Sequence, residues 1–348
     1  MTDLGRPRVL FVVDAGPEVG GGHVMRALTL AGALADRGAA CAFLAAPDVA
    51  AVLDAFADNR VQRVAAAATA PEALVAAAGA AAFDAVVFDH FRLGREHQSE
   101  IARRRPALVV DDLADRPLHA DLVLDPGPAR RAEDYAGLVG AETRLLLGPI
   151  YALVRPAFAA VRETALVRRA EGRLERVLVS LGLTDVGAIA GRVVNRLLPR
   201  LGEAGVDVAL GAAAPSRAAL ERLAERDPRV RVHVETKDMA GLMAAADLAV
   251  GAGGSAAWER CVLGLPTVLV VQAENQEPAA RALAQSGAAE VIDARAPDFE
   301  AAFDRAYTGL ARSPERRAKL SRISAGLCDG LGAGRVAEAF LSLPGSRS

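Results

Sequence analysis

Short apolar runs that stop abruptly at a polar residue constrain the fold of this chain more than any other feature. Residues 9–13 are five apolar residues in succession, and Asp14 ends the run. Three glycines follow, and from Val24 to Leu34 apolar residues recur at the spacing of one helix face. A strand without polar alternation is typical of a parallel sheet that is covered on both faces. The opening therefore predicts a buried strand, a glycine loop and a helix.

This alternation of buried strand and helix continues along the chain and predicts an α/β fold with doubly wound parallel sheets. Further strands are expected at residues 40–44, 85–88, 108–110 and 122–124, and later at 176–181, 206–210, 230–234, 248–250 and 267–271. Hydrophobic residues make up 52% of the chain but aromatic residues only 4%, so Ala, Val and Leu are expected to fill the interior.

The length of 348 residues exceeds what one domain usually holds, and the sequence predicts two. The charged stretch 164–175 contains a glycine and separates the two series of strands. We therefore expect an N-terminal domain at 1–165 and a C-terminal domain at 176–348, with the helices after residue 297 as candidates to pack back on the first domain. Because ligands of parallel sheets bind at the carboxyl ends of the strands, the ligand is expected in the cleft between the two domains.

Charge and cysteine content exclude several functions. The formal net charge of -2 leaves no basic field for a nucleic-acid partner. Cys41, Cys261 and Cys328 are widely separated and odd in number, which predicts no disulfide framework and a cytoplasmic location. No segment approaches about eighteen uninterrupted apolar residues, so no integral membrane segment is expected. Asp111 and Asp112 lack a third ligand at metal-binding spacing, and neither a metal nor another cofactor is predicted.

The first glycine loop, Gly20, Gly21 and Gly22, runs directly into His23. It lacks the lysine and hydroxyl of a Walker loop, and Met25 occupies the third glycine position of a dinucleotide fingerprint. The loop is either a phosphate site or a structural turn. At the start of a helix the positive end of the dipole disfavours the imidazolium, so His23 is expected to stay neutral and to suit a general base. The alternative is a histidine that caps the turn.

The second glycine loop, Gly253, Gly254 and Ser255, also follows a strand and precedes a helix. Its backbone and hydroxyl donors suit a diphosphate. Glu259, one turn into the helix and on the same side as Ser255, can accept from a ribose diol or can be a first-turn acid that the helix dipole favours. The spacing also fits a dinucleotide fingerprint, but the next strand ends in Gln272 rather than in an acid, which argues against that use.

Polar residues at other strand ends have two interpretations each. Asp89 and His90 end a buried strand and either reach the ligand edge of the sheet or form a core pair. Thr184 and Asp185 either contact the ligand or cap the following helix. The same choice applies to the adjacent pair Asn275 and Gln276.

Taken in order, five segments resemble the PseG family of UDP-sugar hydrolases, which share the two-domain fold of GT-B glycosyltransferases such as MurG. They are GGGHVMRALTLAGAL, FDHF, DDLADR, LLLGPIYALVRPAF and GAGGSAAWERCVLGLPTVLVVQAENQ. The resemblance runs from about Val9 to Ile292. It implies a GT-B fold of two Rossmann-like domains that face an interdomain cleft.

The resemblance also implies an activity and a set of site residues. The activity is hydrolysis of UDP-2,4-diacetamido-2,4,6-trideoxy-β-L-altropyranose to UDP and free sugar in pseudaminic acid biosynthesis, with His23 activating the water. A small-molecule UDP-sugar is the implied substrate, and other enzymes of that pathway are implied partners. The implied substrate- and UDP-binding residues are Asp14, Gly20, Gly21, Gly22, Asp89, His90, Tyr151, Thr184, Asp185, Met239, Gly253, Gly254, Ser255, Glu259, Asn275 and Gln276.

Four positions depart from the pattern of that family. Val12 stands where the family usually has an arginine, Phe91 where it has a tyrosine, Leu183 where it has a second glycine, and Asp125 near a common asparagine. A glycosyltransferase that uses a UDP-amino sugar, and a UDP-sugar-binding protein without turnover, therefore remain alternatives to the hydrolase.

Overall fold

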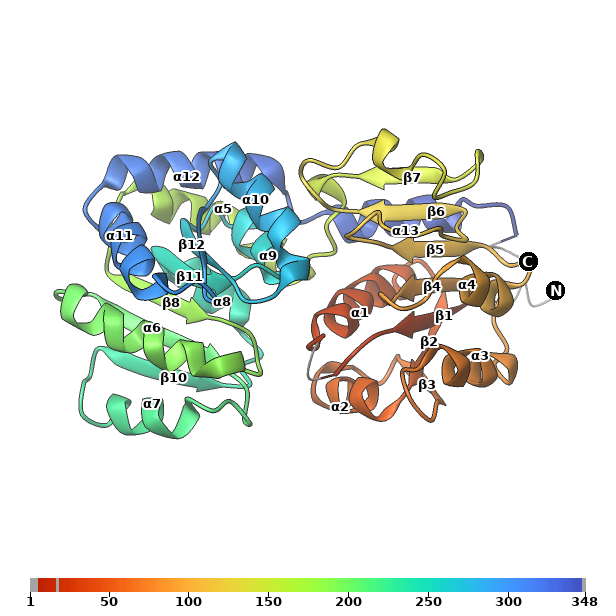
Figure 1. Cartoon of the computed structure of the whole chain (residues 1–348), viewed down its shortest axis with the longest axis horizontal. Helices are drawn as coiled ribbons and strands as arrows, with labels where there is room; N and C mark the ends of the chain where they lie inside the picture. The colour runs from red at the N-terminus through yellow and green to blue at the C-terminus, as the bar shows by residue number, and fades with distance from the viewer. Residues whose placement is uncertain (1–5, 17–18, 346–348) are drawn as a thin grey trace. The chain divides into compact units, whose positions relative to one another are not determined.

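The computed structural model describes residues 6–16 and 19–345 and consists of two compact units (Figure 1). The N-terminal unit is Met1–Val154 together with Leu331–Ser348, and the C-terminal unit is Arg155–Gly330. The division lies ahead of the expected boundary at 164–175, and the last helix belongs to the first unit.

The N-terminal unit contains a seven-stranded sheet in which every neighbouring pair is parallel. Across the sheet the strands are β3 (Gln62–Ala65), β2 (Ala40–Ala45), β1 (Arg8–Val13), β4 (Ala85–Asp89), β5 (Ala107–Val110), β6 (Leu122–Asp125) and β7 (Arg144–Leu147). Its helices are α1 (Gly22–Ala35), α2 (Pro47–Phe56), α3 (Pro71–Gly79), α4 (Arg95–Ala102) and α13 (Gly332–Leu341), with short 3-10 turns η1 (Ala132–Tyr135) and η2 (Pro149–Tyr151).

Strand β1 is buried on both faces, which explains its unbroken apolar sequence. Val9, Phe11 and Val13 pack into a core with α1 and α13, whereas Leu10 and Val12 pack into a second core on the opposite face. Both faces of the sheet are therefore covered by helices, and polar side chains gather at the strand ends.

The C-terminal unit repeats this architecture with a six-stranded parallel sheet. Across the sheet the strands are β10 (Val230–Val234), β9 (Gly205–Leu210), β8 (Arg176–Ser180), β11 (Leu248–Ala252), β12 (Thr267–Val271) and β13 (Glu290–Asp293). The helices are α5 (Pro156–Ala170), α6 (Ile189–Leu197), α7 (Arg217–Ala224), α8 (Met239–Ala245), α9 (Ala256–Val262), α10 (Glu277–Ser286), α11 (Phe299–Ala311) and α12 (Pro314–Leu327), with 3-10 turns η3 (Val186–Ala188), η4 (Leu198–Arg200) and η5 (Glu274–Gln276).

Most of the stretch that looked like a linker belongs to α5. Proline at the first helical position starts this helix. Of its charged residues, Glu163 is exposed, Arg162 and Arg168 are half-buried and Arg169 is buried. Phe158 is fully buried, and the guanidinium of Arg162 donates to the carbonyl oxygens of Val262, Ala325 and Cys328. These contacts attach α5 to the C-terminal unit.

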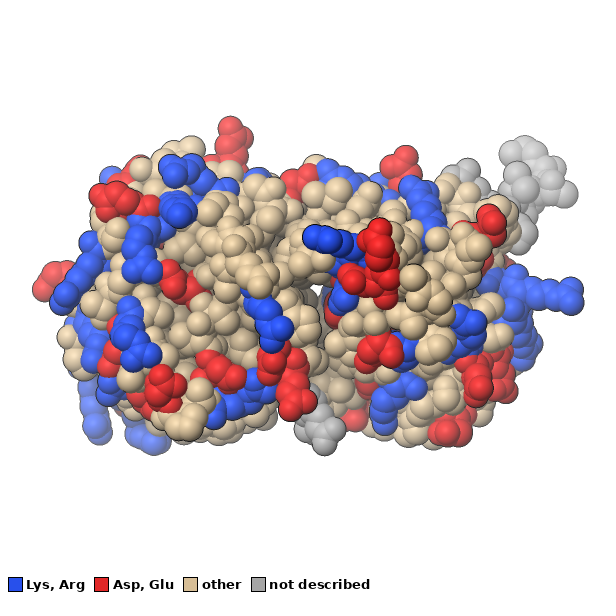
Figure 2. Space-filling view, turned by 45° about the horizontal axis from the view of Figure 1, so that its top comes forward, with Lys and Arg blue, Asp and Glu red and all other residues tan. Residues whose placement is uncertain are grey.

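Surface charge is mixed in sign: Figure 2 shows basic and acidic side chains interspersed over the visible face. Within residues 6–16 and 19–345, no helix is long and apolar enough to span a membrane.

Candidate functional site

In the N-terminal unit, the first glycine loop connects β1 to α1. The N–H of Gly20 donates to the carbonyl oxygen of Gly16 at 2.7 Å, and Gly20 has a φ of +77°, a left-handed conformation that glycine adopts without strain. This turn starts α1 at Gly22, so that His23 is the second residue of the helix.

His23 forms a hydrogen-bonded pair with Asp89, the last residue of β4. Nδ1 of His23 lies 2.5 Å from Oδ1 of Asp89, and the two residues are 7% and 1% exposed. Because a carboxylate only accepts, Nδ1 carries the hydrogen and donates it. In the neutral ring the lone pair is then on Nε2, and no described residue bonds to that nitrogen. The pair has the orientation of a general base held by a carboxylate.

Arg26 binds the same carboxylate and extends the cluster. It lies one helical turn after His23, and its Nε and Nη2 donate to Oδ2 and Oδ1 of Asp89 at 2.5 and 2.6 Å. Its Nη1 lies 2.8 Å from Oδ2 of Asp112, which follows β5. Burial alone would raise the pKa of Asp89, but the charges and hydrogen bonds of Arg26 and His23 outweigh it and hold the pKa well below its ordinary value. Asp89 therefore stays a carboxylate.

Arg26 was missed in the sequence analysis. Its spacing of three residues from His23 was an available signal, because residues at i and i+3 share one helix face. Phe91 was noted only as a departure from the family pattern, and its ring packs edge-on against the His23 ring with centroids 4.6 Å apart.

His90 has a different role from His23. Its Nε2 lies 2.9 Å from the carbonyl oxygen of Thr69, so Nε2 carries the hydrogen, and its Nδ1 accepts from the backbone N–H of Arg92 at 3.2 Å. Burial lowers the pKa of His90, which favours this neutral form. Both ring nitrogens are thus occupied by backbone partners, and neither is left for a ligand. Asp14 is buried beside it, with Oδ1 at 3.6 Å from His90 Nε2.

A second buried cluster lies at the ends of β5 and β6. The Tyr135 hydroxyl lies 3.0 Å from Asp111 and 2.8 Å from Asp125, and Arg130 pairs with Asp125 at 2.5 Å. Burial raises the pKa of Asp125, although the Gly127 N–H and Arg130 oppose it. These bonds hold the loops after β5 and β6. Tyr151 lies in η2, after the edge strand β7, and packs against the core that contains α1 and α13.

In the C-terminal unit, the second glycine loop joins β11 to α9. The backbone N–H groups of Gly254 and Ser255 donate to no acceptor in the part of the chain that the structure describes. Glu259 lies on α9 with its carboxylate paired to Arg155, whose Nε and Nη2 are 2.9 and 2.8 Å from the same oxygen, Oε1. Burial raises the pKa of Glu259, and Arg155 opposes it. The loop thus combines free backbone donors with an oriented carboxylate.

The residues that follow β8 and β12 are bonded to each other near this loop. The side chain of Gln272 donates to the carbonyl oxygen of Leu181, and Gln276 accepts from the Gln272 N–H at 3.0 Å. A Cβ at Gly253 would lie 3.1 Å from Gln276 Cβ, so that residue borders the glycine loop.

The remaining predicted site residues of this unit differ in burial and in hydrogen bonding. Asp185 is buried and accepts from the N–H groups of Ala190 and Ser216, which is a structural role. Thr184 and Asn275 are exposed, and Met239 is the half-buried first residue of α8. Among the described residues, no group of three His, Cys, Asp or Glu side chains lies close enough to hold a metal.

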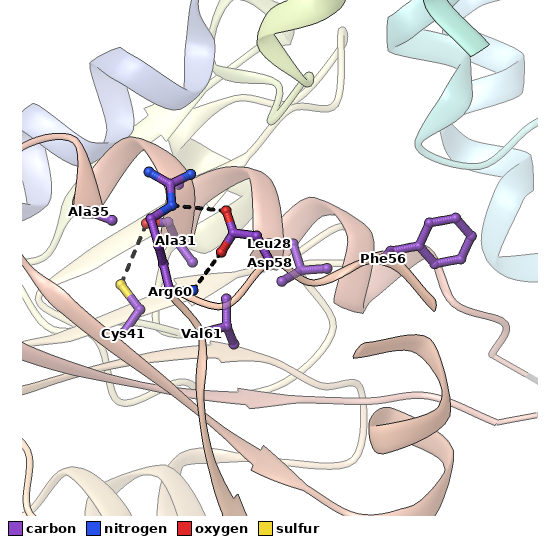
Figure 3. Close-up of a pocket in the computed structure, with 9 residues that line it drawn as sticks. Leu28, Ala31, Ala35, Cys41, Phe56, Asp58, Arg60 and Val61 are labelled. Atoms are coloured by element: carbon purple, nitrogen blue, oxygen red, sulfur yellow. Dashed lines mark hydrogen bonds and ion pairs between the residues drawn. The ribbon is translucent and has the colours of Figure 1, made fainter. Parts of the chain in front are cut away.

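A separate cavity of about 120 Å³ lies in the N-terminal unit, where Leu28, Cys41 and Val61 are among its lining residues (Figure 3). The Cys41 thiol donates to the Ala31 carbonyl oxygen, and burial raises its pKa to about 12. The thiol is therefore protonated, and none of the predicted site residues lines this cavity.

Known proteins resemble the chain in sequence. Residues 208–321 match the glycosyltransferase family 28 C-terminal domain. The chain is 33% identical over 153 residues to the spore coat polysaccharide biosynthesis protein SpsG of Bacillus subtilis, which covers 43% of this chain and 44% of that protein. The chain thus aligns with less than half of that relative. It is 22% identical to the UDP-2,4-diacetamido-2,4,6-trideoxy-beta-L-altropyranose hydrolase of Campylobacter jejuni, over 80% of this chain and 97% of the hydrolase.

Solved structures resemble the chain over nearly its whole length. MurG of Acinetobacter baumannii superposes with a TM-score of 0.68 at 17% identity, covering 97% of this chain and 100% of MurG. A calicheamicin glycosyltransferase superposes with a TM-score of 0.61 at 18% identity, covering 97% of this chain and 99% of that enzyme. With two parallel-sheet α/β units of seven and six strands, these neighbours confirm the predicted fold class: the chain has the GT-B fold.

Proposed function

We propose that the protein hydrolyses a UDP-linked amino sugar to UDP and free sugar, with His23 as the general base. The observation that carries the proposal is the His23–Asp89–Arg26 cluster. Asp89 accepts from Nδ1 of His23, so the lone pair on Nε2 is available to a water. Arg26 keeps Asp89 ionised, and an ionised carboxylate stabilises the imidazolium that forms when a proton is taken up.

The proposed step is a displacement at the anomeric carbon. The water oxygen bonds to that carbon while its proton passes to Nε2 of His23. The bond between the anomeric carbon and the diphosphate oxygen breaks, and UDP departs with the electron pair. Gly20, Gly21 and Gly22 leave space beside His23 for the sugar.

We assign the UDP moiety to the second glycine loop in the C-terminal unit. The N–H groups of Gly254 and Ser255 are free to donate to phosphate oxygens. Both bonds from Arg155 go to Oε1 of Glu259, which leaves Oε2 to accept from the ribose diol. The similarity to the Campylobacter jejuni hydrolase supports the substrate class.

A glycosyltransferase is the second candidate, favoured by the match of residues 208–321 to the glycosyltransferase family 28 C-terminal domain. In that reaction the base would take its proton from an acceptor hydroxyl rather than from water. The two functions differ in whether UDP is released without an acceptor.

The test is NMR of the purified protein with UDP-2,4-diacetamido-2,4,6-trideoxy-β-L-altropyranose and related UDP-amino sugars. We expect UDP and reducing sugar to appear without an acceptor, and His23→Ala to bind UDP normally while turnover falls roughly 100- to 10,000-fold. His119→Ala is the matched control, because it removes an imidazole of the same unit outside the cluster. Normal turnover by His23→Ala would exclude the proposed base, and UDP release only with an acceptor would identify a transferase.

A further inference from the structure

Asp112, in the loop after β5, connects the two buried clusters of the N-terminal unit. Its Oδ2 lies 2.8 Å from Nη1 of Arg26, in the cluster that contains His23. Its main-chain carbonyl oxygen accepts from Nη2 of Arg130 at 2.8 Å, and Arg130 is itself paired with Asp125 in the second cluster. Arg130 thus holds the backbone of Asp112, and the Asp112 carboxylate binds Arg26.

Arg26 is bound by two carboxylates that follow neighbouring strands of the sheet. Asp89 ends β4, and Asp112 follows β5, which pairs with β4. The side chain of Arg26 is only 11% exposed. Burial alone would lower the pKa of Arg26, but the attraction of Asp112 and Asp89 outweighs it and raises the pKa above its ordinary value. Arg26 is therefore a fixed positive charge.

The charge of this cluster depends on Asp112. One guanidinium is bonded to two carboxylates, so the cluster holds one net negative charge while the His23 ring is neutral. A proton taken up by His23 then makes the cluster neutral. Without the Asp112 carboxylate, the same proton would turn a neutral cluster into a positive one. A net charge in a buried place is unfavourable, so Asp112 should favour the proton on His23.

The charged groups on the other side chains after β1 and β4 do not replace this carboxylate. His90 is neutral, and a charge on His23 further disfavours a charge on His90. Asp14 has an opposite charge beside it, since its Oδ1 lies 3.6 Å from Nη2 of Arg92. These two charges largely cancel at the position of the His23 ring.

Charges on the elements that pack against α1 also differ from Asp112. Asp48, on α2, borders the start of the glycine loop, but it is exposed, and water and salt screen an exposed charge. Strand β2 contributes Cys41, whose thiol stays protonated. Helix α13 passes beside Arg37, which follows the opposite end of α1.

We propose that Asp112 is a positioning residue for the general base: it holds Arg26 against Asp89 and supplies the second negative charge, so that protonation of His23 neutralises the cluster. Asp112 acts through Arg26 and not by contact with the water. The inference rests on the proposed function, because it names a further residue that acts on the same base.

Nitrogen NMR of the His23 ring over a range of pH, in the protein without substrate, tests the charge. Asp112→Asn is the main variant, because its amide oxygen can still accept from Arg26 but carries no charge. We expect His23 to take up its proton roughly one pH unit lower in this variant than in wild type. The neutral ring should keep its hydrogen on Nδ1, because Asp89 is intact.

Two further variants separate the charge from other effects of the substitution. Asp115→Asn is the matched control: it removes a carboxylate of the same loop that is exposed and pairs with Arg116, and it should leave the protonation of His23 unchanged. Asp112→Glu keeps the charge, so its His23 should take up the proton at a pH nearer to that of wild type.

Steady-state kinetics with the UDP-sugar measure the consequence for turnover. We expect kcat of Asp112→Asn to fall about 3- to 10-fold with KM unchanged, because the rate follows the strength of a general base less than proportionally. Asp112→Glu should recover part of this loss. A residue that only braced the loop would lower the melting temperature and leave kcat of the folded protein unchanged.

The same protonation of His23 in wild type and Asp112→Asn would overturn the proposal, as would an equal shift in Asp115→Asn. It would also be overturned by an Asp112→Glu variant that behaves like Asp112→Asn, because charge would then not be the cause. Asp112→Ser, which is also neutral, carries the same test if Asp112→Asn does not fold. If the wild-type protein turns over no UDP-sugar, the proposed function fails, and the NMR comparison still decides whether Asp112 acts on His23.

Discussion

Replacing Asp89 with asparagine changes one oxygen to an NH2 group at the centre of the His23 cluster. The wild-type carboxylate accepts from Nδ1 of His23 and from Nε and Nη2 of Arg26. The amide has only one acceptor oxygen, and Arg26 offers only donors. The oxygen therefore turns to Arg26 and the NH2 to His23, so Nδ1 must become the acceptor and the ring hydrogen moves to Nε2. The proposed base then has no lone pair on Nε2, although the ring stays in place.

The expected loss of rate follows from this change of tautomer, and the expected loss of stability from the broken ion pair. Loss of a general base costs roughly 100- to 10,000-fold in rate, equivalent to about 3–5 kcal/mol of transition-state stabilisation. Removing one partner of a buried ion pair costs about 3–5 kcal/mol of stability. We expect a stability loss near the lower end, about 3 kcal/mol, because Arg26 keeps its contact with Asp112.

Steady-state kinetics with the UDP-sugar and urea denaturation measure the two effects. We expect kcat to fall with little change in KM, because in the proposed mechanism the cluster acts on the water and not on UDP. Asp111→Asn is the control: Asp111 is equally buried and bonds to Tyr135 and Arg116, away from His23. A wild-type kcat for Asp89→Asn, or an equal loss of kcat in Asp111→Asn, would refute the reasoning.

The difference in the free energy of unfolding between wild type and Asp89→Asn should also depend on pH. The pKa of Asp89 is held below its ordinary value in the folded chain. The stabilisation of the folded chain by ionised Asp89 is therefore fully present above the pKa of an unfolded aspartate, near 3.9, and is lost as the pH falls below that value. The difference between wild type and Asp89→Asn should be constant from about pH 6 to 8 and shrink below about pH 4.

Two further predictions concern stability. Burial raises the pKa of Asp125 in the folded protein, so the folded protein holds this proton more tightly than the unfolded chain does. The contribution of Asp125 to the free energy of unfolding therefore falls as the pH rises from about 4. The free energy of unfolding of Asp125→Asn, relative to wild type, should therefore increase between pH 4 and pH 7 in urea denaturation, and a decrease would contradict the sign of the shift. Ala188 has a left-handed φ of 52° before α6, so Ala188→Gly should raise the stability of the C-terminal unit by up to about 1 kcal/mol. An unchanged or lower urea midpoint would show that the turn is not strained.

The strands that could be predicted from the sequence are mainly those that are buried in the structure. Strands β1, β4, β8 and β12 carry continuous apolar sequences because neighbours and helices cover both their faces. Three strands were missed, β3, β7 and β13, and each lies at the edge of a sheet with partly exposed residues. Half-exposed edges need no apolar run, so their sequences resemble loops.

The candidate site was predictable only as a set of separate residues. The glycine loop and the helix start indicated His23, and the end of an apolar strand indicated Asp89. The pairing of the two spans 66 residues, and nothing local in the sequence indicates which strand end faces the histidine. From the sequence, Asp89 and His90 were expected either to reach the ligand edge of the sheet or to form a core pair. In the structure the two have different partners: Asp89 bonds to His23 and Arg26, and His90 bonds to backbone groups of Thr69 and Arg92.

By itself the sequence determined that this chain forms two parallel-sheet units, with a glycine loop after a buried strand in each. Local apolar patterns suffice for this because burial on both sheet faces requires them. Only the tertiary structure decided which ring nitrogen carries the hydrogen in His23 and in His90. Those properties depend on partners that long-range packing brings within hydrogen-bond distance. The carboxylate of Asp89, for His23, and the carbonyl oxygen of Thr69, for His90, are the two partners.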